Sequence, residues 1–241
     1  QQALFLKSNG SLWGMGRNNK GQLGDANSSN QPTPIEIVSS GVIAFASGSG
    51  HTLIVKDDGS LWSVGFNSSG QLGDNSRTDR TTPVQILDAN VTAVSAGSDS
   101  SLVLKADGSL WVMGRNEFGK LGAGSTERHI VPHQIVDANV TKIFADRHKS
   151  GFLKTDGSLW LMGMNQSGEF GDGRVPERKS PVQVTTGLAT PSTPAHDSDL
   201  DGDGFIYAEE VGYGSDPDSN ASIPGLDFGL VAYYPFDGNA S

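Results

Sequence analysis

The sequence predicts an all-β fold built from one repeated unit of about four short strands, as in the blades of a propeller or the coils of a solenoid. Gly-Ser-Leu-Trp occurs four times, and its tryptophans, Trp13, Trp62, Trp111 and Trp160, are spaced 49 residues apart. Periods of roughly 40 to 50 residues are typical of such arrays. The chain has 241 residues, of which 35% are hydrophobic, 18% are charged and 32 are glycine. This composition disfavours a helical bundle.

Each unit reads Lys-x-Asn/Asp-Gly-Ser-Leu-Trp, which predicts a β-hairpin. The turn pairs are Asn9-Gly10, Asp58-Gly59, Asp107-Gly108 and Asp156-Gly157. A two-residue turn of type I′ needs positive φ at both central positions, and Asn or Asp followed by Gly adopts it at low cost. In the third unit we expect the two flanking strands over residues 101–105 and 109–114.

One further strand is expected on each side of the hairpin. Apolar segments precede the hairpin at 91–94 and 140–143, and others follow it at 83–86 and 181–184. The last strand of a unit opens with proline, which suits a sheet edge because proline has no N–H to donate.

The tryptophan strand is apolar on both faces, as in Leu110–Met113. Such a strand is expected between neighbouring sheets, with its tryptophan in the core.

Every tryptophan strand is followed by Gly-x-Asn-x-x-Gly-x-Leu/Phe-Gly, at residues 16–24, 65–73, 114–122 and 163–171. Glycine permits left-handed backbone, and asparagine side chains hydrogen-bond to nearby backbone groups. We therefore expect the asparagines of this turn to have a structural role. They are Asn18, Asn67, Asn116 and Asn165.

These motifs resemble the repeats of the regulator of chromosome condensation family, in which a DG-x-x-W hairpin is followed by a G-x-N-x-x-GQLG turn. Residues 70–74, Gly-Gln-Leu-Gly-Asp, match this pattern closely, and the resemblance covers residues 1–185. It implies a β-propeller of four-stranded blades, seven in the family. Four units are present and the first lacks its opening strand, so the resemblance implies that about three blades lie upstream.

The fourth unit departs from the others near the start of its hairpin. A histidine that is frequent in the family is present as His51 but is replaced by Ser100 and Lys149 in the aligned positions. Asp146 stands where the earlier units have glycine, and Gly151 stands where they have leucine. We expect this blade to be irregular at one rim.

The chain shows little sign of catalytic or nucleotide-binding chemistry. Residues 114–120 superficially resemble a phosphate-binding loop, but Leu121 replaces the expected Ser or Thr, and the aligned residues Gln22, Gln71 and Glu169 make Lys120 a structural position. His129 and His133 are four residues apart, but Pro132 and the β context disfavour the helical geometry of a zinc pair. No serine or cysteine partner is recognisable in the sequence for His51, His148 or His196.

The loops between the GQLG turn and the last strand differ most among units. They span residues 25–33, 74–82, 123–131 and 172–180, and we expect them on one rim. Their charges could form a partner surface, since binding residues tend to lie on loops over a rigid scaffold. A solvated rim is the alternative. The charged residues are Arg77, Asp79 and Arg80 in the second unit and Arg174, Glu177, Arg178 and Lys179 in the fourth.

Charge separates the array from the C-terminal segment. Residues 1–185 hold all 17 Lys and Arg and 17 Asp and Glu, whereas residues 186–241 hold ten acids and no base. This distribution argues against nucleic acid as a partner, because phosphate backbones require a dense positive field. Cysteine is absent, and no apolar stretch approaches the roughly 20 residues that span a bilayer. The start at Gln1 suggests a fragment with any signal peptide upstream.

After a Pro- and Thr-rich linker at 186–196, residues 197–222 contain a calcium-binding pattern. Counting from Asp199, acidic residues fill positions 1, 3, 5 and 12 of a twelve-residue loop and glycine fills position 6, which suits a hard ion with six to eight oxygen ligands. A disordered acidic spacer is the alternative. The expected Ca²⁺ ligands are Asp199, Asp201, Asp203, the Phe205 carbonyl, Tyr207 through water, and Glu210.

The segment through Gly214-Ser-Asp-Pro217 resembles bacterial thrombospondin type 3 repeats, with Ser215 in place of the usual threonine. Asp216, Asp218 and Asn220 begin a second alternating run, but Ala221 replaces its turn glycine. Residues 226–241 resemble the opening strand of a concanavalin A-like or laminin G-like lectin domain.

These modules together suggest a non-enzymatic binding or scaffold region of a secreted or cell-surface protein of bacterial type. Its expected partners are a protein or carbohydrate at the propeller rim or at the lectin-like domain. Two alternatives remain. The modules could be accessories of an extracellular hydrolase, or the propeller could catalyse guanine nucleotide exchange on a small GTPase.

Overall fold

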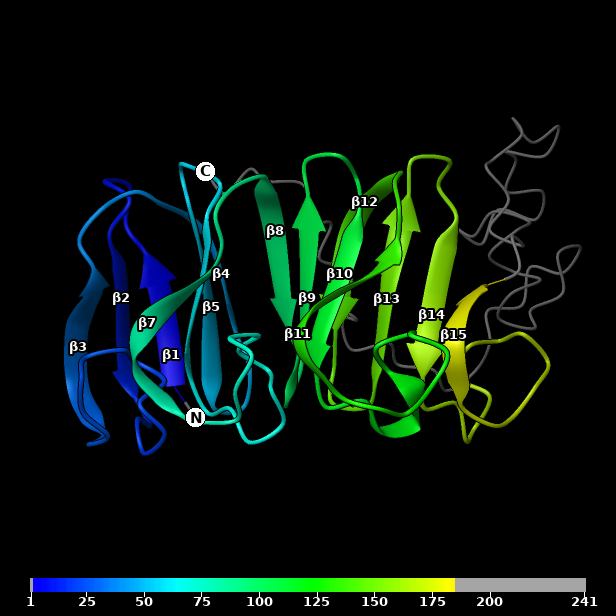
Figure 1. Cartoon of the computed structure of the whole chain (residues 1–241), viewed down its shortest axis with the longest axis horizontal. Helices are drawn as coiled ribbons and strands as arrows, with labels where there is room; N and C mark the ends of the chain where they lie inside the picture. Colours follow the sequence, from blue (N-terminus) through cyan, green and yellow to red (C-terminus); the bar gives the residue numbers. More distant parts are fainter. Residues whose placement is uncertain (1, 185–241) are drawn as a thin grey trace, which may run out of the picture. The chain divides into compact units, whose positions relative to one another are not determined.

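The computed structural model describes residues 2–184, which form four antiparallel sheets in chain order (Figure 1). The predicted linker, calcium segment and lectin-like segment lie outside the described residues. The first sheet contains β1 (Gln2–Leu6), β2 (Leu12–Gly16) and β3 (Gln31–Val38). The second contains β4 (Val42–Ser47), β5 (His51–Lys56), β6 (Leu61–Gly65) and β7 (Arg80–Leu87). The third contains β8 (Val91–Ala96), β9 (Ser100–Lys105), β10 (Leu110–Gly114) and β11 (His129–Val136). The fourth contains β12 (Val140–Ala145), β13 (Lys149–Lys154), β14 (Leu159–Gly163) and β15 (Arg178–Gln183).

The predicted all-β propeller of four-stranded blades is confirmed. Three sheets have four strands, and the first has three because it lacks the strand that opens the others. In each sheet the strands pair in chain order, and the opening strands β4, β8 and β12 contact one another across neighbouring sheets. A single-turn 3₁₀ helix, η1 (Glu117–Gly119), interrupts the turn after β10. Within residues 2–184, no helix is long and apolar enough to cross a membrane.

Three apolar clusters hold the four sheets together, one at each junction. Leu12, Val42 and Ile54 pack between the first two sheets, and a second cluster around Leu53 and Met113 packs between the second and third. The third cluster, between the last two sheets, includes buried Phe152 and Met162, which are 1% and 0% exposed. A fully buried apolar side chain of this size contributes about 1.5–3 kcal/mol. Burial between sheets therefore makes a large contribution to the stability of the array.

The hairpin turns differ from the predicted type I′. In the third unit Gly108 has φ +78°, but Asp107 is not in the left-handed region. Lys105 N donates to Ser109 O at 3.1 Å and Gly108 N donates to Lys105 O at 2.9 Å, which describes a three-residue loop closed by a glycine bulge. The carboxylate of Asp107 accepts a bond from Ser109 N at 2.9 Å, so Asp acts as a local cap and only glycine needs positive φ.

The repeated tryptophans are half-buried, and Trp62, Trp111 and Trp160 pack against the apolar clusters, in line with the predicted core packing. Trp111 packs against the cluster between the second and third sheets, and its Nε1 donates to Ser109 Oγ at 2.9 Å. Lys105 Nζ lies over the ring, 4.2 Å from its centroid. The same serine and lysine contacts recur in all four units. In each unit the serine therefore satisfies the indole N–H, and the lysine ammonium makes a cation–π contact with the face of the ring.

The prolines lie within the edge strands and do not open them. β7 begins at Arg80 and β15 at Arg178, three residues before Pro83 and Pro181. Both strands pair on one side only, with β6 and β14 respectively, so the predicted edge position is confirmed. The hydrogen-bond ladder between the paired strands is irregular in both cases, with register shifts between β6 and β7 and between β14 and β15.

Candidate functional site

The two ends of the sheets carry different connections. The hairpins lie at one end, which we call the hairpin rim (upper edge in Figure 1). The other end, the long-turn rim, carries the turns at 17–30, 66–79, 115–128 and 164–177 and the short loops at 48–50, 97–99 and 146–148 (lower edge in Figure 1). The start of β5 faces the end of β6 through His51 and Gly65, and Gly65 also pairs with Arg80 at the start of β7. The variable loops therefore emerge together on the long-turn rim, as expected.

A buried asparagine braces each long turn. Asn67 Oδ1 accepts from Leu72 N at 3.0 Å, and its Nδ2 donates to Asp74 Oδ1 at 2.9 Å and to Ser76 O at 3.2 Å. The acceptor contact recurs at 2.8–3.0 Å in all four units. The predicted structural role of these asparagines is confirmed, and the long-turn rim has a hydrogen-bonded frame.

Much of the charge predicted as a partner surface stabilises this frame. Arg80 pairs with Asp74 at 2.7 Å, and Arg178 pairs with Asp172 at 2.6 Å. Asp79 Oδ1 accepts from Asn67 N at 2.8 Å. Burial raises the pKa of Asp74, but hydrogen bonds from Ser76, Arg80 and Asn67 outweigh it and hold this pKa below the usual range. The bond from Arg178 lowers the pKa of Asp172.

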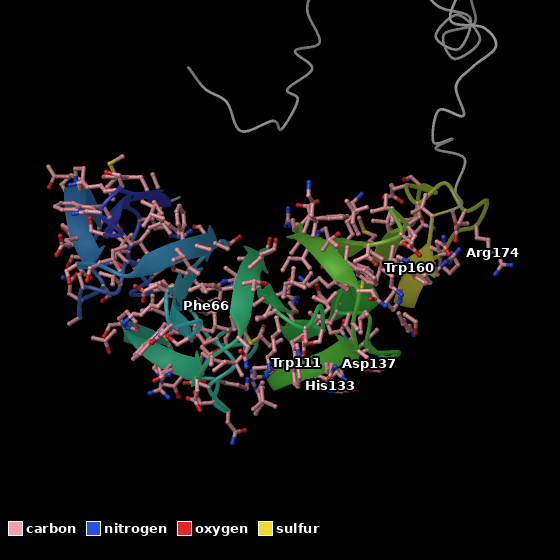
Figure 2. All side chains as sticks on the ribbon, turned by 90° about the horizontal axis from the view of Figure 1, so that it is seen from above. Phe66, Trp111, His133, Asp137, Trp160 and Arg174 are labelled. Carbon is pink, nitrogen blue, oxygen red and sulfur yellow. The ribbon has the colours of Figure 1, made fainter. Side chains whose placement is uncertain are left out.

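The remaining residues of the predicted surface are more accessible. Arg77 Nε donates to Ser68 O at 2.7 Å and its side chain is exposed. Arg174 lies in the last long turn (Figure 2). Glu177 and Lys179 also belong to the fourth unit, where Lys179 packs close to Gly119 of the preceding long turn. This part of the rim combines contacts between units with solvated charge.

Two adjoining pockets lie where the opening strands end. The larger, of about 600 Å³, is lined by Arg17, Arg147 and the small residues around Gly48 and Gly97. The second, of about 430 Å³, lies between the turn after β10 and the loop at 146–148. Arg147 lines both pockets, so they form one polar region on the long-turn rim.

The sequence patterns did not single out this region, although a signal was present. The second pocket includes Arg115, Lys120 and His148, and the first includes Asp146. Lys120 stands where the first two units have glutamine, and Asp146 stands where the second and third have glycine. Only the fold brings these two departures from the repeat to one rim.

Lys120 is a buried cation, 2% exposed. In the first two units the aligned Gln22 and Gln71 accept a bond from the turn backbone at 2.9 and 3.0 Å, which an ammonium cannot do. Lys120 Nζ instead donates to Arg147 O at 3.0 Å. Burial lowers the pKa of Lys120, and the nearby Asp99 carboxylate opposes this shift. This bond joins the third unit to the fourth.

The structure supplies a serine beside His51 that the sequence did not reveal. His51 Nε2 is 3.0 Å from Ser101 Oγ, and Ser101 Oγ donates to Gln71 O at 2.8 Å. Both side chains are fully buried, so the serine hydroxyl is inaccessible to a substrate. Burial, with a smaller contribution from the charge of Lys120, lowers the pKa of His51 to about 4. His51 is therefore a neutral core histidine.

The other histidines have different environments. The rings of His129 and His133 stack with centroids 4.2 Å apart on β11, because a register shift bends this strand beside β10. His133 lies on the third sheet, where it pairs with Val112 of β10 (Figure 2). Among residues 2–184, no three His, Cys, Asp or Glu side chains form a metal-binding group. His196 and the six predicted calcium ligands lie outside the described residues.

The sequence matches a family model described as the regulator of chromosome condensation (RCC1) repeat, over residues 9–55, 58–104 and 107–146. These segments cover more than half of the chain. The chain belongs to the RCC1 repeat family. A second RCC1 repeat model matches residues 42–71 and 91–120 of these RCC1 units. A search of curated protein sequences returns no significant match.

Solved structures share this RCC1 fold. Yeast RCC1 (Prp20) bound to Kap60 is 22% identical with a TM-score of 0.69, over 78% of this chain and 47% of that one. Prp20p from Saccharomyces cerevisiae is 21% identical with a TM-score of 0.68, over 78% and 49%. Human WBSCR16 is 22% identical with a TM-score of 0.64, over 76% and 49%. The chain spans about half the length of these structures. At these identities and TM-scores the likeness shows a shared fold alone.

Proposed function

We propose that the RCC1 units form a non-enzymatic recognition domain that binds a protein through the long-turn rim. The observation that carries this proposal is a hydrogen-bonded frame, repeated in every unit, that presents side chains differing between units around two polar pockets. A rigid frame lowers the entropy that a binding surface loses on association. The histidine and serine that approach each other are buried and play no part in this surface.

The related structures support a protein as the partner. One contains yeast RCC1 bound to Kap60, and another was described together with the binding properties of Prp20p to Gsp1p and histones. We extend only the class of partner to this chain. A pocket on the rim that is lined by charges of both signs is also consistent with a protein partner.

Site-specific photocrosslinking in the full chain tests the proposal. A photoreactive amino acid at Asn19 or Ser98 lies on the long-turn rim, whereas one at Ser8 or Asp88 lies on the hairpin rim. We expect both long-turn positions to crosslink to the same protein in the native host extract, and neither hairpin position to do so. Equal crosslinking from both rims, or from the hairpin rim alone, would contradict the proposal.

Guanine nucleotide exchange on a small GTPase is a second candidate. The similarity to yeast RCC1 favours it, since the fold is shared over most of the described residues. The release of labelled GDP from a panel of small GTPases, measured with and without the chain, tests this activity. Accelerated release would replace the purely binding role with an exchange reaction.

For the C-terminal residues we propose a calcium-binding spacer in a secreted or cell-surface protein, followed by a lectin-like module that binds protein or carbohydrate. The accessory role beside an extracellular hydrolase is a variant of this proposal. The support is the twelve-position pattern of oxygen ligands from Asp199 to Glu210. Calorimetry should detect Ca²⁺ uptake, and Asp203→Ala or Glu210→Ala should weaken it at least about tenfold, because each removes a charged ligand. Unchanged uptake in both variants would refute these ligands.

A further inference from the structure

The smaller pocket on the long-turn rim collects more hydrogen-bond donors than the protein satisfies. It has a volume of about 430 Å³ and lies between the turn after β10 and the loop at 146–148. Its charged and titratable lining consists of Asp99, Arg115, Glu117, Lys120, Arg147 and His148. Two serines complete the wall.

The two acidic side chains of the pocket are both engaged by one arginine. Arg115 Nη1 lies 3.5 Å from Asp99 Oδ2, and Nη2 contacts Glu117. These partners raise the pKa of Arg115, so the guanidinium stays charged. Within residues 2–184, no carboxylate lies within 4 Å of the side-chain nitrogens of Lys120 or Arg147. Asp146 is next to Arg147 and lines the adjoining pocket, but it forms no ion pair with it.

Lys120 gives the pocket a buried and incompletely bonded cation. Its ammonium has three N–H donors, and the protein offers one acceptor, the Arg147 carbonyl at 3.0 Å. A charge that is removed from water is costly unless it is paired. An anion in the pocket would supply the missing partner.

His148 and Arg147 also line this pocket. The Nδ1 atom of His148 is buried without a partner among the described residues, and the ring packs edge-on against Phe118. Arg147 is exposed and presents a guanidinium fork. Buried polar atoms in folded proteins are nearly always bonded. His148 and Lys120 line the same pocket, so an acceptor bound there would complete the bonding of both side chains.

We propose that this pocket binds the carboxylate of an Asp or Glu side chain in an acidic segment of the partner protein. Lys120, Arg147 and His148 donate to its oxygens. A carboxylate accepts hydrogen bonds only, and its two oxygens match the arginine fork. A doubly charged phosphate fits less well, because Asp99 and Glu117 remain in the wall. This inference deepens the proposed function and rests on it.

Fluorescence anisotropy of a labelled glutamate-rich peptide with the full chain tests the pocket, and the same peptide with Gln in place of Glu is the control ligand. We expect binding of the Glu peptide only. Lys120→Gln and Arg147→Ala should each weaken it at least about tenfold, since each removes a charge-assisted contact. Lys120→Gln installs the residue that the first two units carry, so its fold should be retained. Lys142→Gln, the same change at an exposed position near the other end of β12, should alter affinity less than about twofold.

Three results would overturn the inference. They are equal binding of the Glu and Gln peptides, wild-type affinity in a folded Lys120→Gln variant, and displacement of the peptide by inorganic phosphate at equal concentration, which would indicate a general oxyanion site. If the peptide fails to bind while the long-turn rim still crosslinks to a protein, the carboxylate pocket is wrong and the proposed function stands. If the peptide binds and the rim crosslinks to no protein, the proposed function fails and the pocket remains as a carboxylate site.

Discussion

Gly97 provides a test of how neighbouring blades pack at the long-turn rim. A Cβ atom added to Gly97 would lie 2.4 Å from Asp146 O in the next unit and 2.7 Å from Ser100 Oγ. Normal carbon contacts are about 3.5 Å, so the backbone of one sheet would have to move by about 1 Å. Gly97→Ala should therefore cost about 2 kcal/mol, within the range of overpacking a close-packed site.

Thermal and urea unfolding followed by circular dichroism measure this effect. For an array of this size, about 2 kcal/mol corresponds to a fall in Tm of about 4–8 °C. Asp146→Ala is the matched control, because Asp146 occupies the equivalent position in the fourth unit and is exposed. We expect its unfolding free energy to change by less than about 0.5 kcal/mol. A Gly97→Ala variant as stable as the wild type would show that the opening strands do not pack backbone against backbone as described.

Two further changes test the frame and the core. Asn67→Ala leaves the buried Leu72 N without its acceptor and removes a bond to Asp74, so urea unfolding should show a loss of about 2–4 kcal/mol. Ser68→Ala is the control and should change the unfolding free energy little. Equal effects of the two changes would argue against the asparagine brace. His51 has a folded pKa of about 4 against an ordinary value of 6.5, so the unfolded chain binds the additional proton between these values. The contribution of His51 to the free energy of unfolding is therefore complete above pH 6.5, and the free energy of unfolding should fall by about 3 kcal/mol as the pH drops towards 4. His51→Gln should flatten this part of the pH profile, and an unchanged slope would assign the loss to other groups.

Local sequence was sufficient to predict most of the fold. The four copies of Gly-Ser-Leu-Trp, 49 residues apart, gave the number of units. The Asp-Gly and Gly-x-Asn patterns located the hairpins and the braced turns within a few residues. These features were predictable because their hydrogen bonds join residues close in the chain, as between Asn116 Oδ1 and Leu121 N at 2.8 Å. The hairpin type was missed, because an Asp-Gly pair suits both a two-residue and a three-residue loop. In the longer loop the Asp107 carboxylate accepts a bond from Ser109 N at 2.9 Å.

The candidate site was much less predictable. The charged loops were correctly placed on one rim, but Arg80 and Arg178 serve the turns themselves, and the pocket residues Arg115 and Arg147 were not identified. His129 and His133 stack because of a bend in β11 that their spacing on a regular strand does not suggest. Each of these outcomes depends on contacts between segments far apart in the sequence.

The sequence by itself determined the repeating unit, its strand order and its family, because these depend on short-range turn chemistry copied four times. The tertiary structure alone decided which of the differences between units lie together at one site. The Lys120 ammonium reaches the Arg147 carbonyl, 27 residues further along the chain, only because consecutive sheets stack face to face. Stacking makes neighbours of residues from different positions in consecutive units, and the pocket on the long-turn rim lies at such a junction.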